Sequence, residues 1–295
     1  MREAASNWAA AIRPKTLWAA VGPVLVGTAF AFRDGLADLT WAGVALAAAI
    51  LLQVGTNLHN DWSDARHGAD NAQRRGPVRV TQAGLLTPTQ VLRAALVAFF
   101  LAAVLGVVGT IHAGWPIAVL AAASVAAGLA YTGGSRPLGY RGFGDVLVLL
   151  FFGPVAVVGT YYVQALQLTP QAALAGLGPG LVATAVLVAN NIRDRGSDQA
   201  ASKRTLVVRL GPAFGRWEYA ACAVLGTTAP TLLLAADGPR LWHLLPLVAL
   251  APALALSAVV LRGADGIELN PLLGRTAQLL LLSALMTAVA ALITA

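Results

Sequence analysis

The segment Asn57–Arg79 concentrates side chains that could bind a metal ion and an anion. It reads NLHNDWSDARHGADNAQRRGPVR and follows an apolar run. On a helix, spacings of three and four residues place its first polar side chains on one face: Asn57, Asn60, Asp61 and Asp64. A further acid, Asp70, follows. Mg²⁺ prefers hard oxygen ligands, usually a few carboxylates together with substrate phosphates. The segment therefore predicts a magnesium site.

A second polar cluster follows the apolar run Leu181–Ala189. It begins with Asn190 and Asn191 and carries Asp194 and Asp198, four residues apart and so on one helix face. A carboxylate at membrane depth is costly and is by default a functional hypothesis. We predict that the two clusters face each other across a membrane-embedded cavity and hold a diphosphate through Mg²⁺.

Basic and phenolic side chains near these clusters could bind phosphate oxygens that a metal leaves uncovered. Arg79 is the main candidate downstream of the first cluster, and Lys203 follows the second. The stretch YTGGSRPLGYRGFGD adds Tyr131, Tyr140 and Arg141, and Arg13 precedes the first apolar run. A topogenic role for the basic residues, or an interfacial role for the tyrosines, remains an alternative at each position.

Other chemistries have little support in the sequence. The four histidines are scattered, and the single cysteine, Cys222, lies in an apolar run. The spacing of the histidines does not predict a zinc site, and a single cysteine cannot form a thiolate cluster. The chain has no GxxxxGK[ST] phosphate loop and no nucleophile elbow.

The composition indicates how these residues are positioned. Of 295 residues, 58% are hydrophobic and 11% are charged, whereas soluble domains have about 25% charged residues. The chain is therefore predicted to be one all-α polytopic membrane domain over residues 1–295, embedded in the lipid bilayer. Its net charge of +7 is explained by membrane topology, so no nucleic-acid partner is expected.

Nine apolar runs approach the roughly 20 residues that cross a bilayer, and residues 1–12 resemble a short amphipathic surface helix. The predicted spans are Thr16–Phe32, Trp41–Asn60, Gln90–Ile111, Trp115–Gly134, Phe143–Val163, Gln171–Asn191, Phe214–Ala236, Leu241–Leu261 and Thr276–Thr294. With nine spans, all of the 20 lysines and arginines except Arg33 and Arg240 fall on one side. The positive-inside rule then predicts a cytoplasmic N-terminus and a cytoplasmic active site in the cell membrane.

These motifs resemble the UbiA superfamily of intramembrane prenyltransferases. Asn60-Asp61-Trp62-Ser63-Asp64 matches its first acidic motif, and Asp194–Asp198 matches its second Asp-x-x-x-Asp motif. Further matching stretches are IRPKT (12–16), GPVR (76–79), YTGGSRPLGYRG (131–142), GTYYVQ (159–164) and NNIRDRGSDQAASKRTLVVRLG (190–211). The last two favour the branch that uses dihydroxynaphthoate in menaquinone synthesis.

The resemblance implies nine helices around a central cavity and two Mg²⁺ ions. It assigns metal binding to Asn60, Asp64, Asp194 and Asp198, and catalysis to Asp61 with the same three aspartates. Arg13, Arg79, Tyr131, Arg141 and Lys203 would bind the diphosphate. One departure is Gly68, where the superfamily often has aspartate; Asp70 is the nearest acid, and Gln73 replaces another acid found in this branch. The ligand set on that loop therefore stays open.

The implied reaction joins a polyprenyl diphosphate to an aromatic acceptor, dihydroxynaphthoate, with loss of diphosphate and CO₂. Other acceptors remain open: 4-hydroxybenzoate, homogentisate, a chlorophyllide, haem or a glycerol phosphate. A secondary transporter would also carry Asn and Asp, although at the bilayer midplane. The DGxxAR…GxxxDxxxD pattern of CDP-alcohol phosphotransferases is absent. The sequence does not give the prenyl chain length, the oligomeric state or the residue that accepts the acceptor's proton.

Overall fold

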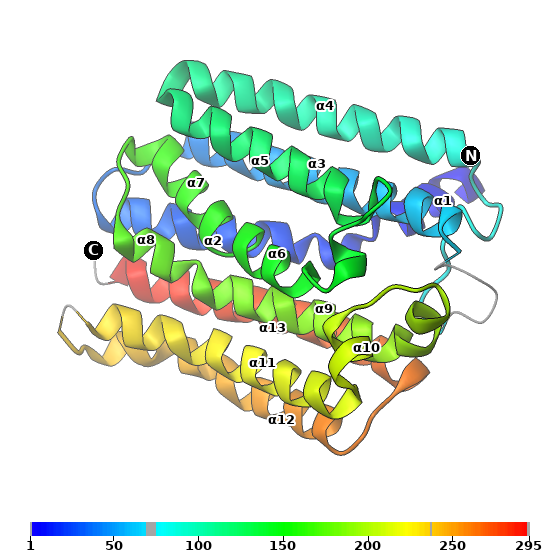
Figure 1. Cartoon of the computed structure of the whole chain (residues 1–295). Helices are drawn as coiled ribbons and strands as arrows, with labels where there is room; N and C mark the ends of the chain where they lie inside the picture. The colour runs from blue at the N-terminus through cyan, green and yellow to red at the C-terminus, as the bar shows by residue number, and fades with distance from the viewer. Residues whose placement is uncertain (1, 69–74, 237, 294–295) are drawn as a thin grey trace.

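The computed structural model describes residues 2–68, 75–236 and 238–293, and within these ranges it is an all-α bundle (Figure 1). Its α-helices are α1 (Arg2–Ile12), α2 (Trp18–Arg33), α3 (Leu39–Arg66), α4 (Pro88–Ala113), α5 (Trp115–Thr132), α6 (Gly144–Phe151), α7 (Pro154–Ala165), α8 (Pro170–Ala175), α9 (Leu177–Ala200), α10 (Leu206–Leu210), α11 (Pro212–Ala235), α12 (Leu250–Leu261) and α13 (Leu269–Ile293). Four 3₁₀ segments join them: η1 (Pro14–Thr16), η2 (Gly139–Arg141), η3 (Leu241–Ala249) and η4 (Gly266–Glu268).

The predicted all-α membrane fold is confirmed. In the described part of the chain, 8 segments are long and apolar enough to span a bilayer, or 9 if the bent pair ending in α2 counts as one span. α2 has only 16 residues, so it reaches spanning length only with the preceding segment, from which it bends by 45°. The two ends of the chain lie at opposite ends of the bundle in Figure 1, as an odd number of spans requires.

Two further spans, α6–α7 and α8–α9, are also interrupted, and each has a glycine at its break. The α6–α7 span breaks before Pro154 and the α8–α9 span at Gly176, and the two breaks touch. A Cβ on Gly153 would lie 2.7 Å from the carbonyl oxygen of Gly176, and one on Gly176 would lie 2.5 Å from the nitrogen of Pro154. Any larger side chain would force these backbones apart.

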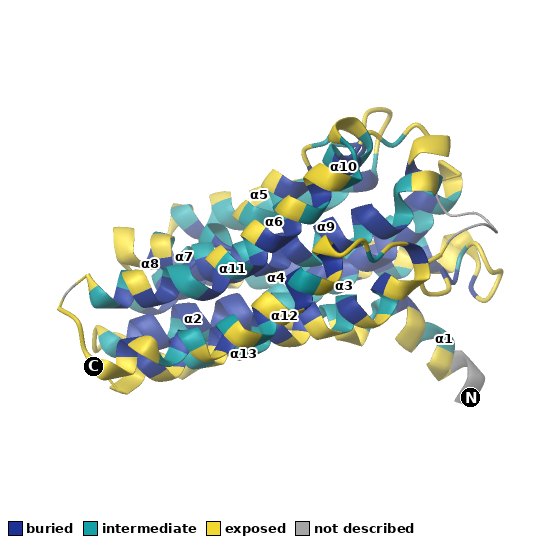
Figure 2. Cartoon of the chain, turned by 90° about the horizontal axis from the view of Figure 1, so that it is seen from below, coloured by how far each residue is buried: buried dark blue, intermediate teal, exposed yellow. Residues whose placement is uncertain are grey.

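Burial follows the expectation for helices in lipid. In Figure 2 the buried stretches of ribbon lie mostly where helices adjoin one another, and the exposed stretches lie mostly on the outside of the bundle. The outer surface carries large apolar groups, among them Phe100, Ile111, Trp217 and Leu232. The fold is thus that of a multi-pass membrane protein.

Both helices continue past the predicted spans into the polar clusters, as the helical spacing of the acids requires. α3 continues from the apolar run through Asp64 to Arg66, and α9 continues through Asp198 to Ala200. Gly68, with φ +72°, follows the end of α3 in the left-handed conformation that glycine adopts most easily. The acids therefore lie on the last turns of two long helices rather than in loops.

Candidate active site

One cavity of about 710 Å³ connects the two acidic helix ends. α2, α3, α5, α7, α9 and α13 all contribute to its wall. One end is polar and includes Asn60, Asp64, Asp194 and Asp198. The remainder is lined mostly by small and apolar side chains such as Ala45, Gly109 and Val163. A mostly apolar pocket with a few convergent polar groups is the usual form of a small-molecule site.

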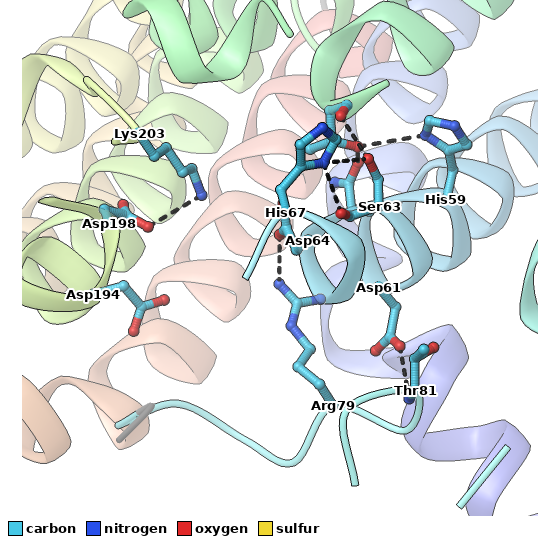
Figure 3. A network of polar contacts seen from close by, with 12 residues as sticks. His59, Asp61, Ser63, Asp64, His67, Arg79, Thr81, Asp194, Asp198 and Lys203 are labelled. Carbon is cyan, nitrogen blue, oxygen red and sulfur yellow. Dashed lines mark hydrogen bonds and ion pairs between the residues drawn. The ribbon is translucent and has the colours of Figure 1, made fainter. Parts of the chain in front are cut away.

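The end of α3 presents two of the predicted ligands to this cavity. The side-chain oxygen Oδ1 of Asn60 accepts a hydrogen bond from Thr132 at 2.7 Å. Asp64 is 3% exposed; its Oδ1 accepts from the Tyr140 hydroxyl at 2.7 Å, and its Oδ2 lies 3.5 Å from Arg79 Nη2. Figure 3 shows Arg79 reaching Asp64 from the loop beneath α3. The orientation of Asp64 is therefore fixed from two sides.

Asp61 is placed differently from the other predicted acids. It is 1% exposed and is not among the described residues that line the cavity. Its Oδ1 accepts from the backbone N–H of Thr81 at 2.9 Å, and its Oδ2 lies 3.8 Å from Arg13 Nη2. Each residue turns an α-helix by about 100°, so Asp61 points well away from Asn60. The prediction that all four polar residues share one face is therefore wrong for Asp61, which does not line the cavity with the other three. Its contacts are those of a residue that positions Arg13 and the loop carrying Arg79.

The end of α9 supplies the opposite wall (Figure 3). Asp194 receives two hydrogen bonds from Arg193, at 2.8 and 2.6 Å. Arg193 is itself held by Asn270 at the start of α13, at 3.1 Å. Asp198 is 3% exposed; its Oδ1 lies 3.3 Å from Lys203 Nζ, and its Oδ2 is buried without a hydrogen-bond partner among the described residues.

Lys203 lies between the two walls. Its ammonium group pairs with Asp198 and sits 5.4 Å from the centre of the Tyr140 ring. Burial by itself would lower the pKa of Lys203, but the carboxylates of Asp64 and Asp198 outweigh it and raise that pKa above the ordinary lysine value. The raised pKa favours the charged form of Lys203 at the polar end of the cavity.

The donor set fits Mg²⁺ held jointly with a phosphate. Among the described residues, no three His, Cys, Asp or Glu side chains form a ready-made metal cage. Mg²⁺ usually takes only one or two carboxylates from the protein and the rest from substrate phosphates and water. Asp64 and Asp198 face the same cavity from different helices, and Asp198 keeps an oxygen without a partner. Both lie at helix C-terminal ends, where the helix dipole also favours a cation.

The remaining predicted residues divide into two groups. Arg13, Arg79, Tyr131 and Lys203 line the cavity. Arg141 does not: it is exposed, and its guanidinium lies 5.9 Å from the ring centre of Phe143. The structure thus gives no support to a diphosphate contact by Arg141, because the η2 turn directs this side chain outward. Asp70 and Gln73 lie outside the described residues.

The sequence offered Tyr140 as a possible donor to the diphosphate, and in the structure its hydroxyl donates to Asp64. Asn270, which holds Arg193, was not predicted, because it precedes the last predicted span and lies in no polar motif. Its role depends on α13 packing beside α9, a contact between distant segments.

Membrane-length helices surround one cavity, and carboxylates from two helix ends lie at its polar end. This arrangement is typical of an intramembrane enzyme. The chain belongs to the UbiA prenyltransferase family, whose model matches residues 20–272. It is therefore a prenyltransferase, and the predicted family is confirmed.

Named relatives resemble the chain over nearly its whole length. It is 42% identical to the 1,4-dihydroxy-2-naphthoate octaprenyltransferase of Mycobacterium tuberculosis, covering 96% of both chains. It is 40% identical to the Escherichia coli protein of the same name, covering 95% of this chain and 92% of the other.

Solved structures agree on the fold. A UbiA homologue from Archaeoglobus fulgidus, bound to DMAPP and Mg²⁺, matches with a TM-score of 0.66 at 13% identity, over 98% of this chain and 100% of that one. The apo UbiA homologue from Aeropyrum pernix matches with a TM-score of 0.69 at 14% identity, over 95% and 96% of the two chains.

Proposed function

We propose that this prenyltransferase transfers a polyprenyl group from polyprenyl diphosphate to 1,4-dihydroxy-2-naphthoate, releasing diphosphate and CO₂ and forming a demethylmenaquinol. One observation carries the proposal: acidic ends of two helices, distant in sequence, line one cavity in a chain 42% identical to a named naphthoate octaprenyltransferase.

The polar end of the cavity would bind the diphosphate. Mg²⁺, when bound by Asp64, Asp194, Asp198 and Asn60, would neutralise the diphosphate and stabilise the charge that develops as it leaves. Arg79 and Lys203, held beside those carboxylates, would add hydrogen bonds to its oxygens. Arg13 and Tyr131 line the same region and would complete this binding site.

The apolar wall of the cavity would accommodate the prenyl tail and the reacting carbon. Breaking the bond between carbon and diphosphate oxygen gives an allylic cation, which water would capture in an open site. Ala45, Gly109, Ile117 and Val163 line the cavity far from the acids and offer the cation no nucleophile. The same wall would pass a long tail toward the lipid.

The acceptor would then attack through the ring carbon that bears its carboxylate. A new carbon–carbon bond forms there, CO₂ leaves with the electron pair returning to the ring, and the ring becomes aromatic again. Because the acceptor and the diphosphate are both anionic, the basic side chains around the mouth would assist both. We place this mouth on the cytoplasmic side of the cell membrane, following the distribution of lysine and arginine.

Purified protein in detergent micelles, supplied with polyprenyl diphosphate and an equimolar mixture of candidate aromatic acceptors, tests the proposal. Mass spectrometry should detect the decarboxylated naphthoate product, and excess EDTA should abolish it until Mg²⁺ is restored. Prenylated 4-hydroxybenzoate or homogentisate as the main product would reject the acceptor assignment. Magnesium-independent solute flux into proteoliposomes without any prenylated product would instead favour a transporter.

A further inference from the structure

Arg13 occupies a backbone conformation that is costly for a residue with a side chain. Its φ and ψ are 57° and 69°, in the left-handed region. In this region the Cβ atom comes too close to the backbone, so residues other than glycine rarely adopt it. Such a conformation persists only where surrounding contacts enforce it, and such residues cluster at functional sites. Arg13 joins α1 to the η1 turn and lines the cavity.

The contacts that enforce this conformation come from Asn57 on α3. Its amide nitrogen Nδ2 donates to the backbone carbonyl of Ile12 and to the hydroxyl of Thr16, both at 2.9 Å. The Thr16 hydroxyl in turn donates to the carbonyl of Arg13 at 2.9 Å. Gln53, one turn earlier on α3, reaches both Asn57 and Thr16 at 3.4 Å. The chain is thus fixed on either side of Arg13.

The side chain of Arg13 is held by the next turn of the same helix. Asp61 follows Asn57 by four residues, so the two lie one above the other on α3. Asn57 is 5% exposed and Asp61 1% exposed, so the bonds they make are sheltered from water. Asn57 fixes the backbone and Asp61 orients the guanidinium, at 3.8 Å. Held by both contacts, Arg13 lies in the wall of the cavity.

We infer that Asn57, acting with Thr16, is a positioning residue that presents Arg13 to the diphosphate of the prenyl donor. The inference rests on the proposed function, because it takes the diphosphate to be the ligand of Arg13. It gives the first asparagine of the NLHND stretch a role other than metal binding: its amide nitrogen donates to the end of α1 at Ile12 and to the η1 turn at Thr16.

The test measures binding and turnover separately. Binding is measured with farnesyl thiodiphosphate, an unreactive analogue of the donor, and turnover gives kcat and KM for polyprenyl diphosphate. Arg13→Gln should weaken analogue binding by about tenfold or more, since it removes a charge-assisted contact. Asn57→Ala should weaken it by about two- to tenfold, the range of a neutral hydrogen bond. Neither variant should lower kcat as much as it raises KM.

A double-mutant cycle distinguishes positioning from general structural support. If Asn57 acts through Arg13, the double variant Arg13→Gln/Asn57→Ala should bind the analogue no more weakly than Arg13→Gln alone. The inference would be overturned if the affinity losses of the two single variants multiplied in the double variant, or if the defect of Asn57→Ala were confined to kcat. An unchanged affinity in Arg13→Gln would also overturn it, whereas the proposed function fails only if the wild-type protein does not prenylate the naphthoate.

Thr16 provides a matched pair that does not depend on the folding of Asn57→Ala. Thr16→Val removes the hydroxyl between Asn57 and Arg13 at nearly constant volume, and Thr16→Ser keeps it. Thr16→Val should reproduce the affinity loss, and Thr16→Ser should restore wild-type binding. Thr228→Val is the control, because within the described part of the chain that hydroxyl donates to carbonyls of its own helix. Equal losses in Thr16→Val and Thr16→Ser would reject the role of the hydroxyl.

Discussion

Asp64 and Asp61 lie on the same turn of α3, yet the structure predicts unequal consequences when each becomes asparagine. Each aspartate pairs with one arginine at a similar distance, 3.5 Å for Asp64 with Arg79 and 3.8 Å for Asp61 with Arg13. Each accepts one further hydrogen bond that an amide oxygen would still accept, from Tyr140 and from Thr81 respectively. The two substitutions should therefore change stability to a similar extent. Only Asp64 faces the cavity.

The difference in activity can be bounded from these contacts. Losing an outer partner of a metal ligand typically costs 10- to 100-fold, so losing a charged ligand should cost at least about 100-fold. That is about 2.7 kcal/mol of transition-state stabilisation at 1.36 kcal/mol per decade. Asp61→Asn weakens only the hold on Arg13, so we expect about tenfold or less, mainly in KM for the donor.

Initial rates with dihydroxynaphthoate, polyprenyl diphosphate and varied Mg²⁺ give kcat and KM for each variant. Thermal unfolding in the same detergent checks that the two variants are comparably folded. Activity of Asp64→Asn within tenfold of wild type would refute the assignment of Asp64 as a ligand. Equal damage from Asp61→Asn would refute the distinction between a cavity acid and a positioning acid.

Three further predictions use other features of the site. Lys203→Gln should raise KM for the donor about tenfold at every pH near neutrality. The pKa of Lys203 is raised above the ordinary lysine value, so the wild-type side chain stays charged over this range; a pH-rate profile of both proteins checks this. Gly159→Leu should reduce the use of long donors about tenfold relative to geranyl diphosphate in a competition assay, because Gly159 lines the cavity and leucine would narrow it. The backbone accepts the substitution, since a Cβ at this position would meet Leu120 at an ordinary contact distance of 3.6 Å. Arg13→Gly should unfold at a higher temperature than Arg13→Ala, by the equivalent of about 1 kcal/mol, because glycine relieves the left-handed strain.

The sequence was sufficient for the membrane class and for most of the site. Hydrophobic runs near 20 residues and a scarcity of charge specify helices in lipid, because there each helix must satisfy its own backbone hydrogen bonds. Helical spacing also placed Asn60 with Asp64, and Asp194 with Asp198, on single faces, since that relation depends only on the local helix.

Spacing along one helix could not decide which acid faces the cavity. Asp61 and Asp64 have the same chemistry and adjacent positions in the motif, but their directions differ relative to α1 and the loop beneath α3. Only the packing of those segments turned Asp61 toward Arg13 and left Asp64 at the cavity wall. Arg141 is a similar case, because the η2 turn determines the direction of its side chain.

The sequence by itself determined the helices, their membrane lengths and the acids on their last turns, because these follow from local spacing and hydrophobicity. Only the tertiary structure brought the ends of α3 and α9 to one cavity, joined Asn270 to Arg193, and fixed Arg13 through Asn57. These contacts join residues far apart in sequence, and their geometry depends on how the helices pack.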